Sequence, residues 1–463
     1  MRMVDTYPVL VVGLGHIGLP LALTLAKAGY QVQGVDTDPE AIQSILRGQP
    51  RIYEPGITAL LAKFLGHNLS VTLPEFVEKI EVPRAIVVCV ASNHAKTDRN
   101  PDLTSLQRSA SWIQTVLRFG DLVIVRSTVP IGTTRSLIKP LLENETMKAG
   151  IDFGLAYCPE RVLEGAVLRE IEGIPQIIGG IDEESSANAE ILFSKVTPHR
   201  LRVSSLEAAE TVKLIDNVYR DTRFAFANTI AEMCEGLGLN SWEIIRAANY
   251  EYPRNSIPVP SPGVGGSCLP KDSRFLLYSA EGSNSELALV SSARKVNENT
   301  PVRLARRVKD AVPLEGTLVF VAGFAFKGVP ETKDVRESPT TEFIKELLRE
   351  GAVITGYDPA VDGATIAAMG VSPMESLDSG LRGCDICVFM TNHSQFQILG
   401  VEGLAQRLKV GALVVDGWNM FDQKECVRRG FSYIGNGNGV VIGKDQLEAS
   451  IAADAASPTA FGR

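Results

Sequence analysis

A single cysteine, Cys268, follows a run of glycines in the stretch 263–272, which reads Gly-Val-Gly-Gly-Ser-Cys-Leu-Pro-Lys-Asp. Small neighbours leave such a thiol open to a reactant, and the nearby ammonium of Lys271 favours the thiolate, which is the reactive form. Asp272 adds a carboxylate to the same stretch. The pattern predicts a nucleophilic cysteine behind a flexible loop. Taken alone, it fits a glycine-rich surface loop with an incidental thiol equally well.

A second pattern with chemical meaning lies near the N-terminus, where three glycines have the spacing G-x-G-x-x-G over 13–18. An apolar run over 8–12 precedes them, a helical pattern follows, and a second apolar run over 32–35 ends at Asp36. A strand, glycine turn, helix, strand and acid in this order predict a dinucleotide-binding unit. The alternative is a strand-to-helix turn that merely needs glycines.

The residues of this unit have distinct expected parts in binding a cofactor. Gly13 permits the tight turn, Gly15 lets the backbone approach a pyrophosphate, and Gly18 allows close packing of helix and strand. The positive N-terminal end of the helix, next to Ile17, then faces the phosphates. Asp36 accepts hydrogen bonds from a ribose diol and repels a 2′-phosphate, which favours NAD over NADP. A nicotinamide cofactor and a reactive cysteine in one chain suggest oxidation through a covalent thioester.

The composition is that of an ordinary soluble globular protein, with 463 residues of which 45% are hydrophobic and 22% are charged. This length suggests two or three domains. A net charge of −8 argues against nonspecific binding to nucleic acid or to an anionic membrane. Nothing resembles a signal peptide or a membrane span, so a cytoplasmic location is expected.

The seven cysteines show no disulfide framework, which fits a reducing compartment. Cys384 and Cys387 form a C-x-x-C on a predicted buried strand. We interpret both as small core residues, with redox or metal chemistry as the alternative. No second cysteine pair and no clustered histidines supply further ligands, so no metal is expected.

The alternation of apolar runs and helical patterns predicts how the chain is divided. Buried parallel strands, for example over 85–90 and 122–125, place a doubly wound NAD-binding domain at 1–203. A helical connector that includes the Cys268 loop is expected over 204–305, where a long proline-free stretch could join domains or pack against a partner subunit. A second Rossmann-type domain without the glycine motif is predicted over 306–445, and a disordered tail over 446–463. The predicted class is α/β, with two Rossmann-type doubly wound domains joined by the helical connector.

With these motifs in place, the chain resembles the UDP-glucose/GDP-mannose dehydrogenase family of nucleotide-sugar 6-dehydrogenases over roughly residues 8–440. The resemblance implies that NAD oxidises the C6 hydroxyl of a UDP-sugar in two steps. It also implies that Cys268 carries a thiohemiacetal and then a thioester, which is hydrolysed to a carboxylate. The residues that carry the resemblance are the turn at Gly13, Ser127 to Thr133, Cys158 to Gly165, Glu210 to Asn217, the Cys268 loop, and Phe326-Lys327 followed by Thr332, Asp334, Arg336, Ser338 and Pro339.

The resemblance implies roles for five further side chains around the reacting carbon. Lys213 would stabilise alkoxide and oxyanion charge, with Asn217 one helical turn on and on the same face. Asp272 and Thr128 match residues that hold a water. Glu164 matches the proposed general base for thioester hydrolysis.

For most of the remaining matched residues, a purely structural role is an alternative to the functional one. Glu160 either assists catalysis through hydrogen bonds or serves a structural role at a strand end. Lys327 is expected at the UDP phosphates, Arg254 at a sugar or phosphate across a dimer interface, and Arg336 near the cofactor pyrophosphate. Gly265, in the Cys268 loop, is expected to contact the substrate. For the basic residues a surface salt bridge is the alternative.

The signatures of substrate specificity are mixed. The stretch 157–163 and the spacing of Arg254 from Cys268 are similar to the UDP-N-acetylhexosamine branch, which uses ManNAc or GlcNAc derivatives for surface polysaccharide synthesis. The stretch 267–272 and Glu164 are more similar to UDP-glucose dehydrogenases. We expect the N-acetylated substrate, with UDP-glucose as the alternative and GDP-mannose as a distant third. The resemblance also implies a homodimer or a higher homo-oligomer.

Two departures from the common family pattern have no explanation at the level of sequence. Ala91-Ser92 stands where a Thr-Pro pair is frequent, next to the expected cofactor, and Arg126 precedes Ser127. Two other functions compete with the main hypothesis. A single-step NAD-dependent hydroxy-acid dehydrogenase would need no Cys268 and no second nucleotide domain. A non-catalytic nucleotide-binding relative would have no reason to keep the matched side chains.

Overall fold

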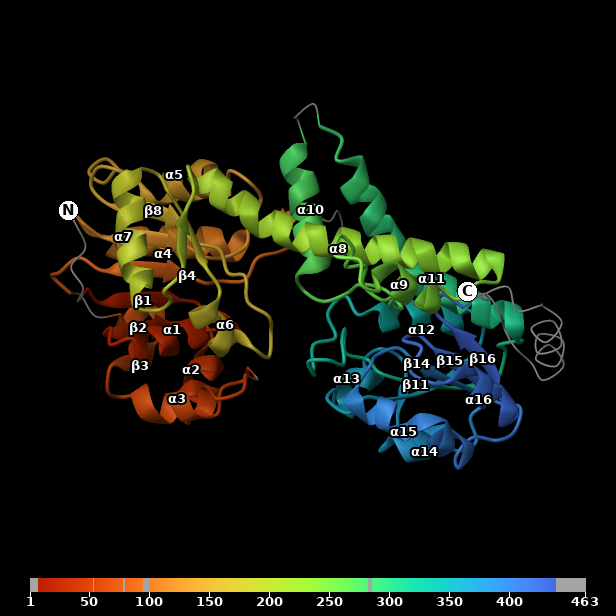
Figure 1. Ribbon diagram of the computed structural model, residues 1–463. Coiled ribbons are helices and arrows are strands. Elements are labelled where there is room, and N and C mark those ends of the chain that lie inside the picture. The colour runs from red at the N-terminus through yellow and green to blue at the C-terminus, as the bar shows by residue number, and fades with distance from the viewer. Residues whose placement is uncertain (1–6, 53, 78–79, 95–99, 282–284, 439–463) are drawn as a thin grey trace. The chain divides into compact units, whose positions relative to one another are not determined.

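The computed structural model describes residues 7–52, 54–77, 80–94, 100–281 and 285–438 (Figure 1). The chain forms two compact units. The first contains the chain up to Val218 together with Lys271–Leu287, and the second contains Tyr219–Pro270 and the chain from Ala288 onward. The helical region expected over 204–305 is therefore divided between the two units. The expected tail over 446–463 lies outside the described residues.

The first unit is built on an eight-stranded sheet in the order β10-β9-β8-β7-β4-β1-β2-β3. All neighbouring strands are parallel except β8 and β9, which pair in antiparallel register. The chain runs outward from β1 to β3 on one side and then crosses to β4, so the strand order reverses between β1 and β4. The strands are β1 (Val9–Val12), β2 (Val32–Val35), β3 (Leu69–Thr72), β4 (Ala85–Val88), β7 (Leu122–Val125), β8 (Gly154–Tyr157), β9 (Gln176–Gly180) and β10 (Arg200–Arg202).

The central strands of this sheet are apolar throughout because helices cover both faces. Every residue of β1, β4 and β7 is buried. Val9 and Val11 belong to one core cluster, whereas Leu10 and Val12 belong to another, as the alternation of side chains along a strand requires. The helices are α1 (Gly18–Lys27), α2 (Pro39–Leu46), α3 (Ile57–Phe64), α4 (Thr104–Val116), α5 (Lys139–Leu142), α6 (Val167–Gly173) and α7 (Glu183–Ser194).

Shorter elements complete the first unit. They are β5 (Asn93–His94) paired with β6 (Pro101–Asp102), η1 (Pro74–Phe76), and η2 (Thr134–Ile138), which is a turn of π-helix.

The second unit carries a six-stranded, all-parallel sheet in the order β13-β12-β11-β14-β15-β16. Numbered along the chain this order is 3-2-1-4-5-6, which is the order of a Rossmann fold. The strands are β11 (Leu318–Ala322), β12 (Val353–Tyr357), β13 (Ser372–Pro373), β14 (Ile386–Phe389), β15 (Leu413–Asp416) and β16 (Ser432–Gly435). The helices are α9 (Ser241–Asn249), α11 (Ala288–Ala311), α12 (Pro339–Arg349), α13 (Gly363–Ala367), α14 (Leu377–Leu381), α15 (Ser394–Ala405) and α16 (Gln423–Arg428).

Cys384 and Cys387 lie in an apolar cluster of this second sheet. Burial raises the pKa of Cys384 to about 12 and that of Cys387 well above its usual value. Thiols in this state are unreactive, which supports the interpretation of both as core residues.

The helices α8 (Leu206–Leu237) and α10 (Leu269–Ala280) each contribute residues to both units. The proline-free stretch from 204 to 252 is not one continuous helix. Helix α8 ends at Leu237, and the next residue, Gly238, has a φ of +69°, the left-handed conformation that glycine adopts readily after a helix. Asn240 then begins α9 by accepting hydrogen bonds from the backbone nitrogens of Trp242 and Glu243.

The prediction of two Rossmann-type domains and a helical region is confirmed. Of the helices within the described ranges, none is both long and apolar enough to cross a membrane.

Candidate active site

The glycine turn after β1 has the geometry that a dinucleotide requires. Gly13 has a φ of +91°, and a side chain at Gly18 would place its Cβ 1.7 Å from the carbonyl oxygen of Gly13. A Cβ at Gly15, by contrast, would meet no protein atom within 4 Å. The protein itself therefore does not require glycine at position 15, but a ligand lying against the exposed backbone would. These residues fit the pyrophosphate of a dinucleotide at the N-terminus of α1, which begins next to Ile17.

Asp36 stands at the carboxyl end of β2 and contacts the same turn. One carboxylate oxygen, Oδ2, accepts a hydrogen bond of 2.8 Å from the backbone nitrogen of Leu14, and Oδ1 accepts one of 3.0 Å from the nitrogen of Asp38. The acid thus fixes the turn as well as presenting its charge where a ribose diol would lie. This geometry fits NAD, and the charge would repel a 2′-phosphate.

The loops after β4 and β7 meet at the same edge of the sheet. The hydroxyl of Ser92 donates to the carbonyl oxygen of Thr128 at 2.5 Å, and the hydroxyl of Ser127 donates to the carbonyl oxygen of Val90 at 2.7 Å. Ser92 therefore ties the cofactor-side loop to the segment that carries Thr128. This contact gives Ser92 a structural reason.

Glu210 on α8 anchors the other end of that segment. Its carboxylate accepts hydrogen bonds from the backbone nitrogens of Gly132, at 2.5 Å, and Thr134, at 2.8 Å. Burial raises the pKa of Glu210 to about 7. The helix that carries Lys213 and Asn217 is thus fixed to the Thr128 segment by a buried carboxyl group.

Asn217 and Asp272, which are 55 residues apart in sequence, are in direct contact. The amide nitrogen of Asn217 donates to Oδ2 of Asp272 at 2.6 Å, and Lys271 lies 2.8 Å from Oδ1 of the same carboxylate. The exposed fractions are 7% for Asn217, 8% for Lys271 and 1% for Asp272. Lys213, one turn before Asn217, is also only 8% exposed. Within the residues that the structure describes, its ammonium has no hydrogen-bonding or ionic partner.

The ammonium of Lys271 has two partners in the first unit. Its ammonium pairs with Asp272 and lies 4.6 Å from the centre of the Phe275 ring. Because these partners already engage the charge, a role for Lys271 in promoting the Cys268 thiolate stays a prediction.

Cys268 belongs to the second unit and is the exposed member of the seven cysteines, of which Cys89 is half-buried and the others are buried. Helix α10 begins at the next residue, Leu269. Pro270 and Asp272 in its first turn are typical signals of a helix start, which the expected glycine-rich loop does not include.

The glycines before Cys268 serve close packing. A Cβ at Gly265 would lie 2.1 Å from the carbonyl oxygen of Glu337, and one at Gly266 would lie 2.8 Å from the ring of Phe326. The nitrogen of Gly266 also donates to the carbonyl oxygen of Arg336 at 3.2 Å. The sequence suggested that these glycines make the loop flexible. In the structure they instead allow the loop to pack closely against the segment 326–339.

The basic residues expected at the substrate and cofactor have partners nearby in the chain. Arg254 donates from Nε to the hydroxyl of Tyr252 at 2.8 Å and lies over the same ring. Arg336 pairs with Asp334, with an Nη2 to Oδ2 distance of 2.7 Å. Lys327 lies 5.3 Å from the centre of the Phe326 ring. Their roles in binding stay predictions.

Glu160 and Glu164 lie on the loop between β8 and α6, and Glu160 is buried whereas Glu164 is half-buried. Oε2 of Glu160 accepts hydrogen bonds from Arg126, whose Nη2 is 2.5 Å away. Oε1 accepts hydrogen bonds from the backbone nitrogens of Arg161 and Val162, both at 2.6 Å. Of the two roles expected for Glu160, these contacts favour the structural one and also account for Arg126.

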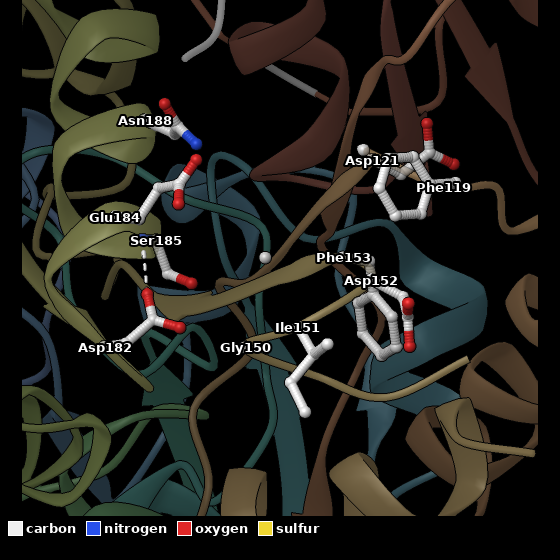
Figure 2. A pocket seen from close by; sticks show the side chains of 12 residues that line it. Phe119, Asp121, Gly150, Ile151, Asp152, Phe153, Asp182, Glu184, Ser185 and Asn188 are labelled. Atoms are coloured by element: carbon white, nitrogen blue, oxygen red, sulfur yellow. Dashed lines mark hydrogen bonds between the residues drawn. The ribbon is translucent and has the colours of Figure 1, made fainter. Parts of the chain in front are cut away.

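Two hollows of the first unit lie at the opposite, amino-terminal edge of the sheet. The smaller, about 50 Å³, lies before β7 and β8, between the start of α7 and residues such as Phe119 and Asp121 (Figure 2). There Asp182 accepts a hydrogen bond of 2.7 Å from the backbone nitrogen of Ser185 and caps α7. The larger, about 320 Å³, lies beside the start of β1 and β2. Neither is lined by a predicted site residue.

Comparison with known proteins agrees with this geometry. Sequence models of three domains of the UDP-glucose/GDP-mannose dehydrogenase family match the chain in order: the NAD binding domain over 7–197, the central domain over 207–299 and the UDP binding domain over 320–423.

Individual relatives match over nearly the whole chain. A UDP-N-acetyl-D-mannosamine dehydrogenase of Pyrococcus horikoshii is 34% identical, over 93% of this chain and 99% of the relative. An NDP-N-acetyl-D-galactosaminuronic acid dehydrogenase of Ralstonia nicotianae is 33% identical, over 91% and 98%. A solved structure of a UDP-D-ManNAc dehydrogenase from Pyrococcus horikoshii superposes with a TM-score of 0.83 at 32% identity, over 93% of this chain and 99% of that one. The chain therefore belongs to the UDP-glucose/GDP-mannose dehydrogenase family, as an NAD-dependent dehydrogenase of nucleotide sugars.

Proposed function

We propose that the chain oxidises the C6 hydroxyl of a UDP-sugar to a carboxylate by four electrons through a thioester on Cys268. NAD, when bound at the turn over 13–18, supplies the hydride acceptor for each of the two oxidations. The thiolate of Cys268 adds to the C6 aldehyde and forms a thiohemiacetal. Loss of a second hydride gives the thioester, and water then releases the uronate and returns the thiol.

The observation that carries this proposal is the state of the seven cysteines. Cys268 is exposed and immediately precedes α10. Burial raises the pKa of Cys89, Cys158 and Cys426 to about 12. A covalent intermediate needs an accessible thiol, and Cys268 is the exposed member of the seven cysteines.

The chain's other side chains supply charge stabilisation and water. Lys213 is a buried residue whose ammonium has no protein partner among the described residues, and it is available to stabilise the alkoxide and the tetrahedral oxyanion. Asn217 orients Asp272 through their hydrogen bond. Asp272 and Thr128 are proposed to hold the attacking water, and Glu164 to accept its proton.

For the substrate we propose a UDP-N-acetylhexosamine, of the ManNAc or GlcNAc type, destined for surface polysaccharide. Support comes from the stretch 157–163, from the position of Arg254, and from the relatives named for N-acetylated sugars. Lys327, Arg254 and Gly265 are the proposed contacts to the nucleotide sugar, and Arg336 the contact to the cofactor pyrophosphate. UDP-glucose is the alternative, because the stretch 267–272 and Glu164 are similar to UDP-glucose dehydrogenases.

We also propose that the chain works as a homodimer or larger homo-oligomer in the cytoplasm. Tyr219, Phe226 and Met233 are spaced by seven residues on α8 and are 65%, 52% and 47% exposed. Such a stripe on one helix face suits a second copy of the same helix. Sedimentation at several concentrations, with Phe226→Asp as the disrupting variant, tests this assembly.

The decisive experiment offers UDP-GlcNAc, UDP-ManNAc, UDP-GalNAc, UDP-glucose and UDP-galactose separately and counts NADH per sugar consumed. Two NADH with an N-acetylated sugar is the expected result. Two NADH with UDP-glucose alone would favour the alternative substrate. One NADH per sugar would contradict the thioester route and favour a single-step dehydrogenase.

A further inference from the structure

The loop between β8 and α6 is held by carboxylates rather than by backbone carbonyls. The nitrogens of Arg161 and Val162 donate to Oε1 of Glu160, both at 2.6 Å. The nitrogen of Leu163 donates to Oε2 of Glu170 at 2.7 Å. An ordinary surface loop leaves most such donors to water. This one has nearly every backbone nitrogen from 161 to 165 bound to an acidic side chain, and it carries the half-buried Glu164.

The first fastening point joins the loop to the sheet. Arg126 follows β7, and it donates from Nε and Nη2 to Oε2 of Glu160 at 3.0 and 2.5 Å. Its Nη1 donates to the carbonyl oxygen of Cys158 and to Oε1 of Gln176, the first residue of β9. The side chains of Arg126 and Glu160 are only 3% and 8% exposed. Both oxygens of Glu160 therefore accept hydrogen bonds, one from Arg126 and the other from the loop backbone.

The second fastening point comes from the segment between α2 and α3. Glu54 is 6% exposed, and its Oε2 accepts a hydrogen bond of 3.1 Å from the nitrogen of Gly165. The same carboxylate lies close to the backbone of Val167 and Leu168 at the start of α6. Both neighbours of Glu164 therefore donate to acids, Leu163 to the half-buried Glu170 and Gly165 to the buried Glu54.

We infer that Arg126, Glu160 and Glu54 are positioning residues that clamp the loop 160–165 and so fix the position of Glu164 within the first unit. The inference rests on the proposed function, in which Glu164 is the base for hydrolysis. A base displaced by about 1 Å can lose on the order of 100-fold in rate. The clamp should therefore govern release of the uronate and not the hydride transfers that precede it.

The kinetic test separates these two phases in Glu54→Leu, which removes the acceptor, and in Glu54→Gln, which keeps an acceptor oxygen. With UDP-sugar and NAD in a quenched-flow experiment, Glu54→Leu should form the first NADH within about twofold of the natural enzyme. Its release of uronate should fall by about tenfold or more, with covalent sugar accumulating on Cys268 by mass spectrometry. The rate of uronate release by Glu54→Gln should lie between those of Glu54→Leu and the natural enzyme. The exposed Glu145→Gln is the control for loss of one negative charge.

A second measurement does not depend on turnover. The clamp predicts slow hydrogen exchange at the amides of 161–163 and 165 in the natural protein, and faster exchange near Gly165 in Glu54→Leu. Arg126→Lys, which keeps the charge but loses the two-pronged contact, should speed exchange at Arg161 and Val162.

The outcomes distinguish the clamp from the function on which it rests. If Glu164→Gln slows release but Glu54→Leu does not, the clamp is wrong and the base stands. If Glu164→Gln leaves release unchanged, the proposed base is wrong, and the positioning role falls with it. If the loop amides exchange equally fast in the natural protein and in the variants, the clamp is absent whatever the enzyme does.

Discussion

The side-chain amide of Asn217 donates a hydrogen bond of 2.6 Å to the buried carboxylate of Asp272, and so joins α8 to α10 within the first unit. Both side chains were singled out from the sequence for separate reasons. Their contact makes them one arrangement, in which the orientation of Asp272 depends on Asn217.

Asn217→Ala should therefore cost both stability and activity. Asp272 is 1% exposed and would lose a donor that water cannot readily replace, which destabilises the fold by about 1 to 3 kcal/mol. Urea unfolding measures the first effect and kcat the second. The exposed Glu232→Ala on the same helix is the control and should change stability by less than about 0.5 kcal/mol. Equal unfolding midpoints for Asn217→Ala and the natural protein would show that the hydrogen bond contributes nothing.

Cys268→Ser should bind NAD normally and yet form no uronate, because a serine hydroxyl is not ionised near neutral pH and cannot replace the thiolate. Fluorescence titration with NAD and product analysis by mass spectrometry measure the two properties. An alkylating reagent at neutral pH should modify Cys268 before the buried cysteines. Near-normal carboxylate formation by the serine variant would remove the covalent role.

Asp36→Ala should relax the preference for NAD over NADP, since it removes the charge that repels a 2′-phosphate. The contact from Leu14 adds a second effect, a looser glycine turn. Asp36→Asn separates the two, because it removes the charge but keeps an oxygen that can accept from Leu14. Both variants should lower the ratio of kcat/KM for NAD to that for NADP. The melting temperature of Asp36→Asn should fall less than that of Asp36→Ala. An unchanged ratio in both would refute the ribose contact.

Gly15→Ala and Gly18→Ala should have opposite consequences. A Cβ at Gly15 meets no protein atom within 4 Å, so the fold should tolerate it while KM for NAD rises. A Cβ at Gly18 would lie 1.7 Å from the carbonyl oxygen of Gly13, so that variant should lower the melting temperature. Thermal unfolding and NAD titration of both variants test the pair. Unimpaired NAD binding by a folded Gly15→Ala would show that the cofactor does not approach this backbone.

Glu210 should make stability depend on pH. Burial raises its pKa from 4.5 to about 7, so the folded state favours the protonated form. The stabilisation is fully present below about pH 4.5 and is lost as the pH rises through about 7, by on the order of 3 kcal/mol. Asp416, with a pKa raised by burial to about 6, adds a loss of the same sign at lower pH. Glu210→Gln should flatten the unfolding free energy between pH 5 and 7, whereas an identical slope would contradict the shift.

The sequence predicts those features of the site that depend on residues close together in the chain. The glycine spacing at 13–18, the acid at 36 and the apolar strands around them predicted the cofactor unit, because a strand and a turn are short-range structures. The strand runs also predicted two doubly wound domains, since a strand buried on both faces must be apolar throughout. The helix start at Leu269 is equally local, because Pro270 and Asp272 in its first turn are sequence signals of one.

What only the tertiary structure decided are the partners of polar side chains that lie far apart in sequence. The sequence alone does not explain Arg126, whereas the structure shows that it donates to Glu160. Nothing in the sequence connects Glu54 with Gly165, which lies 111 positions away. The glycines before Cys268 suggested flexibility, yet contacts with Phe326 and Glu337 show that they permit close approach. Sequence sets which groups can donate, accept or ionise. Which of them meet, and which lose water in doing so, follows from the packing of the whole chain.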